Sequence, residues 1–267
     1  MPAIWSLEDF FARPRYRRLV GIKRITRTVS EHRVVAWARP LPRTVSGQAA
    51  AEEDRGNDVT DASRLRELAA DARPIVVGVC GCPGAGKTTV ASAVADQVGL
   101  ARLHRDTIKN GLGVSTATVD PDGTLQLPEP FHVAGGPFSL QAETILQQVA
   151  RLLVQSGCSF VVETSVLTSE LLALVHAADG VFLAVEVVAD PAVVETRLRA
   201  RTTEGEATAH QLLAQFLRGE MTRPIFAPPR EADWTVVLDT SKGGVPDVTP
   251  VQLGFRAAIA ETWQRSG

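Results

Sequence analysis

A glycine-rich stretch at residues 81–88 contains the residue types that bind phosphate. Its sequence, Gly-Cys-Pro-Gly-Ala-Gly-Lys-Thr, matches the pattern G-x-x-x-x-G-K-[ST]. The glycines allow backbone angles at which main-chain N–H groups face a phosphate, and Lys87 can reach the β- and γ-phosphates of a nucleotide. The hydroxyl of Thr88 is of the type that ligates Mg²⁺. The stretch therefore predicts a site for the phosphates of a nucleotide with Mg²⁺, and the alternative is a chance match in a glycine-rich turn.

The elements on either side of this stretch are those that a phosphate-binding loop needs. Residues 75–81 form an apolar, β-branched run that suits a buried strand. Good helix formers follow from residue 87, so a helix would begin at the loop and direct its partial positive charge at a phosphate. This context favours a true phosphate site. The nucleotide-binding residues that we predict in the loop are Gly81, Cys82, Pro83, Gly84, Ala85, Gly86, Lys87, Thr88 and Thr89.

Strand and helix patterns alternate along the rest of the chain. Further strands are predicted at residues 101–104, 158–164, 181–188 and 234–238. Helices are predicted at residues 138–156, 167–178, 190–201, 209–219 and 250–264, with Asp190 as a cap. This alternation predicts an α/β fold, a five-stranded parallel sheet with helices on both faces. The nearly apolar strand at 181–188 is expected to be central, and residues 107–138 are expected to form a long irregular loop with a functional role.

Several of these segments together resemble the small P-loop kinases. They are the loop at 81–89, Arg-Asp-Thr-Ile-Lys at 105–109, the strand that ends in Glu163 and Thr164, and Arg-Leu-Arg-Ala-Arg at 197–201. The group to which they are most similar contains polynucleotide 5′-hydroxyl kinases, zeta toxins and chloramphenicol phosphotransferase-like enzymes. The resemblance covers about residues 74–264. It implies a P-loop NTPase domain that transfers the γ-phosphate of ATP, with Mg²⁺, to a hydroxyl group.

The resemblance implies that residues 105–109 form the acceptor side of the site. In the family, the aspartate after the second strand accepts the proton of the acceptor hydroxyl, and Asp106 matches it. A base is also needed at this edge of the sheet, near the γ-phosphate, and the alternative is that Asp106 caps a short helix beginning at Thr107. Arg105 and Lys109 are predicted to bind substrate. Lysine at 109 replaces the arginine usual in nucleic-acid kinases of this group and lacks its bidentate geometry, which argues against a nucleic-acid acceptor.

Glu163 and Thr164 end a strand, as the second acidic motif of P-loop proteins does. We predict that Glu163 binds Mg²⁺ through water or holds the acceptor, and that Thr164 lies beside it at the substrate. The alternative for Glu163 is a salt-bridged strand end. Thr88 and Glu163 are the predicted metal-site residues.

Three arginines at helical spacing, Arg197, Arg199 and Arg201, precede a polar break. In the family, a lid arginine at this place stabilises the transferring phosphoryl group or stacks on the base. Arg197 and Arg201 share one helix face and Arg199 points away from both, but the spacing does not decide which arginine reaches the phosphates. Thr240, after the last strand, is expected at the adenine pocket, as in similar kinases, and Arg197 is expected at the nucleotide. The predicted catalytic residues are Lys87, Asp106, Arg199 and Arg201.

Charge divides the chain into unequal parts. Residues 1–43 contain ten Lys and Arg against three Asp and Glu, whereas the whole chain has a net charge of −2. We expect a basic N-terminal extension at 1–43, a linker with a short helix at 44–73 and a P-loop kinase domain at 74–267. The extension is either an arm packed on the domain or a contact surface for an anionic polymer.

Cysteine usage and hydropathy indicate a cytoplasmic protein without a membrane span, because the chain has three cysteines and no long apolar run. Cys80 is expected to be buried in a strand. Cys82 lies at the N-terminus of a helix, which would lower its thiol pKa, unless the side chain points away from solvent. The histidines, His104 among them, lack metal-ligand spacing and are expected to be surface or packing residues.

Two functions of different classes fit these observations. The first is a kinase acting on a small-molecule or nucleotide-like hydroxyl compound, with a nucleic-acid acceptor not favoured. It predicts an acceptor pocket built by residues 107–138. The second is a nucleotide-binding regulatory ATPase whose N-terminal segment engages a partner. It predicts slow hydrolysis and no acceptor pocket, so the pocket distinguishes the two.

Overall fold

The computed structural model describes residues 73–204 and 208–265. The predicted extension at 1–43 and the linker at 44–72 lie outside the described residues. Within the described ranges, no helix combines the length and apolar character needed to cross a membrane.

A five-stranded parallel sheet forms the centre of the structure, as predicted. Its strand order is β2-β5-β1-β6-β7. The strands are β1 (Ile75–Gly81), β2 (Arg102–His104), β5 (Phe160–Glu163), β6 (Val181–Val188) and β7 (Trp234–Asp239). The middle strand is β1, every residue of which is buried. The strand expected to be central, β6, is the interior neighbour of β1, which explains its almost continuous apolar sequence.

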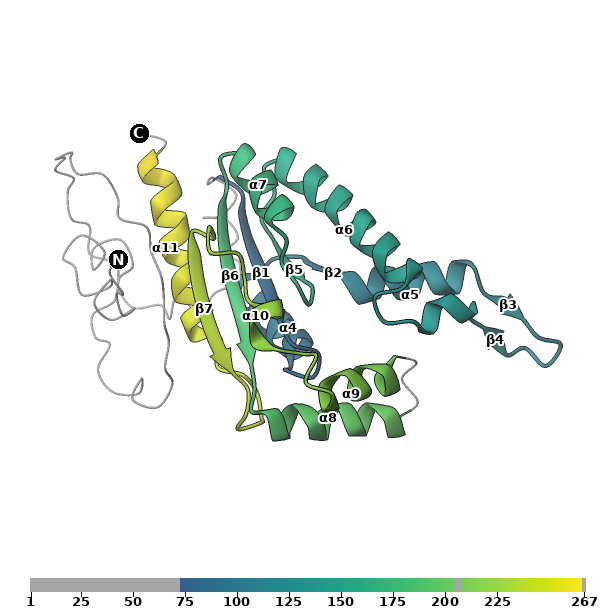
Figure 1. Ribbon diagram of the computed structural model, residues 1–267. Coiled ribbons are helices and arrows are strands. Elements are labelled where there is room, and N and C mark those ends of the chain that lie inside the picture. Colours follow the sequence, from purple (N-terminus) through teal and green to yellow (C-terminus); the bar gives the residue numbers. More distant parts are fainter. Residues whose placement is uncertain (1–72, 205–207, 266–267) are drawn as a thin grey trace.

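Helices cover both faces of the sheet because the side chains of β1 alternate between two cores (Figure 1). Ile75, Val77 and Val79 pack in one core with α4 (Lys87–Val98) and α11 (Thr249–Arg265). Val76 and Cys80 pack in the other core, with α6 (Pro137–Gln155) and α7 (Ser169–Ala177). The prediction that Cys80 is buried is confirmed.

The segment expected to be one irregular loop at 107–138 is largely structured, so that prediction was wrong. It contains the end of α5 (Arg105–Ser115), the hairpin of β3 (Thr118–Val119) and β4 (Leu125–Gln126), and the short helix η1 (Glu129–His132). Helix α5 contains Gly113 because a Cβ there would lie 2.6 Å from the ring of Phe131. A residue that disfavours helix locally is therefore required by the packing of α5 against η1. The hairpin projects away from the sheet (Figure 1).

Three helices between β6 and β7 lie by the carboxyl edge of the sheet (Figure 1). They are α8 (Pro191–Thr203), α9 (Ala209–Leu217) and α10 (Arg223–Phe226), and we call α8 and α9 the lid. Asp190 precedes α8 at the cap position, but its side chain makes no capping hydrogen bond, contrary to expectation. Pro191 at the first helical position, with its fixed φ, is the local signal that begins α8.

Candidate nucleotide and acceptor site

The glycine loop joins β1 to α4 in a conformation that requires its glycines. Gly81 has a φ of 142°, and a Cβ there would lie 2.2 Å from the carbonyl oxygen of Val187. Gly86 has a φ of 90° and forms the N-cap of α4, so the helix begins at Lys87. The backbone N–H groups at this helix start have no partner within the helix and are available to an anion. The loop thus has the form that the sequence pattern predicted.

Lys87 is folded back over the loop. Its Nζ donates a hydrogen bond to the carbonyl oxygen of Cys82 at 3.1 Å. Desolvation lowers the pKa of Lys87 to about 8, against the opposing effect of the negative charge on Glu163. A phosphate placed in the loop would compensate this desolvation, because it supplies negative charge next to the ammonium group.

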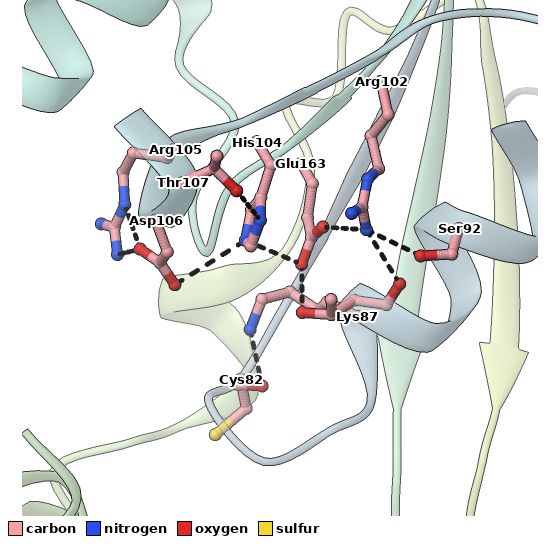
Figure 2. A network of polar contacts seen from close by, with 10 residues as sticks. Cys82, Lys87, Ser92, Arg102, His104, Arg105, Asp106, Thr107 and Glu163 are labelled. Atoms are coloured by element: carbon pink, nitrogen blue, oxygen red, sulfur yellow. Dashed lines mark hydrogen bonds and ion pairs between the residues drawn. The ribbon is translucent and has the colours of Figure 1, made fainter. Parts of the chain in front are cut away.

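Glu163 is buried at the end of β5 and accepts hydrogen bonds from two sides (Figure 2). The hydroxyl of Thr88 donates to its Oε1 at 2.6 Å, and Nη1 of Arg102 lies 3.4 Å from its Oε2. Glu163 is therefore salt-bridged, as the alternative interpretation had it, and it also contacts Thr88, the other predicted metal-site residue, while a role in binding Mg²⁺ or the acceptor stays a prediction. A hydroxyl and a carboxylate in contact fit Mg²⁺, which uses few protein oxygens and completes its shell with water and phosphate. The described residues contain no cluster of three His, Cys, Asp or Glu side chains that would hold a metal alone.

His104 joins the two carboxylates of the site, and sequence analysis missed it. Its Nε2 lies 3.4 Å from Oε1 of Glu163 and 3.9 Å from Oδ2 of Asp106, and its Nδ1 lies 3.0 Å from Oγ1 of Thr107 (Figure 2). Its side chain is 15% exposed and lines the cavity described below, a position that the expectation of a surface or packing residue did not include. The position of His104 at the carboxyl end of β2 was the signal that could have identified it.

Asp106 lies in the first turn of α5 and is held by Arg105. Nε and Nη2 of Arg105 donate to Oδ1 of Asp106 at 3.0 and 2.6 Å. Partial burial acts to raise the pKa of Asp106, but the charges of Arg105, His104 and Lys87 outweigh it and the net pKa is lowered. The N-cap of α5 is His104, so the alternative that Asp106 caps a helix beginning at Thr107 is wrong. Asp106 is thus an ionised carboxylate, with Oδ2 turned toward His104.

One cavity of about 760 Å³ extends from the glycine loop to α5, η1 and the lid. On the acceptor side, Lys109 is buried, and its Nζ lies 5.0 Å from the centroid of the Phe131 ring. Helix α9 forms a wall, and Gln211 bridges it to Ala134 by accepting from its backbone N–H at 2.9 Å. The predicted site residues that line the cavity are Pro83, Gly84, Gly86, Lys87, Thr88, Arg105, Asp106, Lys109, Glu163 and Arg201.

The three candidate lid arginines have different positions. Arg197 donates to the carbonyl oxygen of Gly84 at 3.2 Å and to the Oγ1 and carbonyl oxygen of Thr240 at 3.0 and 2.9 Å. Arg201 lines the cavity, and its positive charge helps to lower the pKa of Lys87. Arg199 pairs with Glu195 at 2.6 Å and lies outside the cavity lining. The shared face of Arg197 and Arg201 thus turns toward the loop, and Arg199 lies apart from it.

Three other predicted residues lie beside the cavity rather than in its wall. Thr240 donates through Oγ1 to the carbonyl oxygen of Ala85 at 2.7 Å, which fixes the last strand to the loop. Thr164 is buried next to the wall residue Glu163. Cys82 is half-buried, with Sγ 3.9 Å from Sδ of Met221, and burial raises its pKa although Lys87 acts to lower it. The expectation of a lowered pKa for Cys82 was therefore wrong, because desolvation of the thiol outweighs the positive charge of Lys87.

The described part of the chain is similar to a family model and to several solved structures. A family model described as an AAA domain matches residues 76–222. A similar solved structure is that of a protein from Chloroflexus aurantiacus J-10-fl, with 21% identity, a TM-score of 0.47 and coverage of 73% of this chain and 98% of that one. Another similar solved structure is that of a gluconokinase from Sinorhizobium meliloti 1021, with 19% identity, a TM-score of 0.44 and coverage of 73% of this chain and 99% of that one. A third is the Mycobacterium tuberculosis APS kinase in complex with AMPPNP and APS, with 21% identity, a TM-score of 0.40 and coverage of 71% of this chain and 99% of that one. No curated protein matches the chain.

Proposed function

Since this chain belongs to the AAA-domain family whose model matches residues 76–222, and has a P-loop kinase-like fold, we propose that it is an ATP-dependent kinase. It would transfer the γ-phosphate of ATP to a hydroxyl group of an acceptor. The observation that carries the proposal is that an ionised carboxylate, Asp106, lines the same cavity as Lys87 of the phosphate loop.

The nucleotide half of the cavity is proposed to hold ATP and Mg²⁺. Thr88 and Glu163 would hold Mg²⁺, which neutralises charge on the β- and γ-phosphates when bound. Lys87 would exchange its hydrogen bond to the Cys82 carbonyl for one to a phosphate oxygen. Arg201 supplies a second positive charge from the lid, and Arg197 bonds the middle of α8 to the loop at Gly84.

The acceptor half is proposed to orient one hydroxyl toward the γ-phosphate. Arg105 occupies Oδ1 of Asp106, so Oδ2 is the oxygen that accepts the hydroxyl proton. The hydroxyl oxygen then bonds to the γ-phosphorus while the bond from that phosphorus to the β,γ-bridging oxygen breaks, and ADP leaves. Positioning of the two reactants in one cavity supplies much of the rate acceleration.

The size and lining of the cavity favour a small-molecule or nucleotide-like acceptor over a nucleic-acid end. Its volume of about 760 Å³ falls within the usual range for small-molecule sites, and α9 closes one side through Gln211. A wall of this kind also favours a kinase over a regulatory ATPase, which needs no acceptor pocket. We propose further that the catalytic domain comprises residues 74–267 and that the protein is cytoplasmic, in accordance with the unpaired cysteines Cys80, Cys82 and Cys158.

The decisive experiment measures transfer of labelled γ-phosphate to a panel of hydroxyl compounds. Asp106→Asn should keep the affinity for a non-hydrolysable ATP analogue and lower transfer by about a hundred- to ten-thousand-fold, because the general base is lost. Asp96→Asn, an exposed position on α4, is the matched control. If Asp106→Asn instead weakened analogue binding and left turnover per bound ATP unchanged, Asp106 would be a structural residue and this mechanism would be wrong.

A further inference from the structure

The segment at 220–226, which we call the return segment, runs from the lid toward the last strand and has no part in the proposed mechanism. Three of its side chains, Glu220, Met221 and Phe226, nevertheless line the cavity. The return segment includes α10, which packs against β1, the strand that leads into the phosphate loop. The contacts that hold this segment therefore help to shape the nucleotide site.

A buried carboxylate of the sheet holds the return segment. Glu186 lies on β6 with 6% exposure, opposite Cys80 of β1 in the strand register. Nε and Nη2 of Arg223 donate to its two carboxylate oxygens at 2.6 and 2.8 Å. Burial of a carboxylate is costly unless a cation and hydrogen bonds compensate it, and a bidentate arginine does both. Arg223 is thus bound at a fixed position on the sheet.

The same segment contacts the phosphate loop two residues earlier in the sequence. Sδ of Met221 lies 3.9 Å from Sγ of Cys82, inside the loop. The carbonyl oxygen of Cys82 is in turn the acceptor for Nζ of Lys87. The backbone of residues 221–223 therefore joins the Glu186–Arg223 pair to contacts that reach Cys82 and Lys87 of the phosphate loop.

We propose that the Glu186–Arg223 pair is a positioning device that clamps the return segment onto the phosphate loop and thereby sets its affinity for nucleotide. Neither residue touches the reacting groups. Arg197 of α8 bonds to Gly84 of the phosphate loop, and Arg223, beyond α9, bonds to Glu186 of β6. The chain is therefore anchored on both sides of α9. The proposal rests on the proposed function only in that a nucleotide occupies the loop.

The test uses the full chain and two measurements. In Arg223→Met, affinity for a non-hydrolysable ATP analogue, measured by calorimetry, should fall by at least about tenfold, as expected for loss of charge-assisted hydrogen bonds. Alkylation of Cys82, followed by mass mapping, should become several-fold faster, because Met221 no longer covers the thiol. Arg223→Lys should be intermediate in both, since lysine keeps the charge and loses the bidentate geometry. Cys158, which is exposed, is the internal reference for alkylation.

A double variant separates positioning from folding. Arg223→Met alone leaves Glu186 buried without its cation, whereas Arg223→Met with Glu186→Gln removes both charges and should fold. The matched control is Arg73→Met with Asp179→Asn, which removes an ion pair between the residues just before β1 and β6. The folded double variant should show the weaker analogue binding and the faster Cys82 alkylation, and the control should show neither.

The outcomes distinguish this proposal from the proposed function. The folded double variant could instead keep both its affinity for the analogue and its rate of Cys82 alkylation within about twofold of the unaltered protein. A change of this size is too small for the loss of a charged contact, so the pair would be only structural and the clamp proposal would be wrong. If the unaltered protein binds no nucleotide at all, the proposed function is wrong, whereas the alkylation result still reports on the contact between the return segment and the loop.

Discussion

At the scale of single residues, desolvation of the loop changes the properties that its side chains have in isolation. The pKa of Lys87 is lowered to about 8 because its ammonium is removed from water, and burial raises the pKa of Cys82 for the corresponding reason. The loop therefore holds a lysine with a pKa of about 8 and a thiol that stays protonated at neutral pH. Of these two side chains, only Lys87 is therefore expected to change its charge when a phosphate binds.

The lowered pKa of Lys87 leads to a pH-dependent prediction. A bound triphosphate favours the charged lysine, so nucleotide affinity should be fully present below about pH 8 and decline as the pH rises through the pKa of the free protein. Calorimetry in buffers of different ionisation enthalpy should detect proton uptake on binding that approaches one at about pH 9 and is small at about pH 7. Lys87→Arg, which stays protonated, should show no such uptake. Binding without proton uptake at the higher pH would contradict the assignment.

At the scale of elements, the acceptor side depends on how α9 meets the loop before α6. Gln211 accepts a hydrogen bond from the backbone N–H of Ala134 at 2.9 Å, and its Nε2 lies 3.4 Å from the carbonyl oxygen of the same residue. Ala134 and Leu212 both line the cavity. The amide side chain of Gln211 therefore bonds α9 of the lid to the backbone of Ala134 on the acceptor side of the cavity.

Removal of this contact should loosen the lid. In Gln211→Ala, hydrogen exchange at the Ala134 amide should become up to about tenfold faster, because the N–H loses a hydrogen bond of ordinary strength. ATP hydrolysis should also rise relative to transfer to the acceptor, since water gains access to the site. Gln148→Ala, an exposed position on α6, is the control. Unchanged exchange at Ala134 would show that packing of α9, and not this side chain, holds the lid closed.

At the scale of the whole molecule, every candidate site residue with a described position lies between β1 and β7 or at Thr240 directly after it. The basic segment at 1–43, which contains ten of the 28 Lys and Arg residues, lies outside the described residues, and the sequence patterns predicted no nucleotide-site residue in it. Nucleotide binding and any contact with an anionic polymer are therefore expected to belong to different parts of the chain.

Deletion of residues 1–72 tests this division. The shortened protein should bind a non-hydrolysable ATP analogue with an affinity within about threefold of the full chain, and it should lose salt-dependent retention on a heparin column. The full chain run at several salt concentrations is the control. A shortened protein that fails to fold would show instead that the N-terminal segment completes the core, which was the alternative interpretation of this segment.

The sequence by itself determined the parts of the molecule that depend on local pattern. The loop from Gly81 to Thr88 was predictable because its glycines, lysine and threonine are contiguous and each is needed for backbone geometry or phosphate contact. The strands followed from apolar runs, and the common face of Arg197 and Arg201 followed from helical spacing. The segment that was misassigned, at 107–138, nevertheless lines part of the cavity, as the kinase hypothesis predicted, with Lys109 and Phe131 among its lining residues.

Only the tertiary structure decided the features that depend on distant residues and on removal of water. Helix α5 contains Gly113 because the ring of Phe131 packs against that position. His104 contacts Glu163 because the fold brings the ends of β2 and β5 together. The fold also pairs Glu186 with Arg223, and burial reverses the expected pKa shift of Cys82. Side-chain pairing and desolvation depend on which surfaces pack together in the folded chain. Local sequence patterns do not specify this packing.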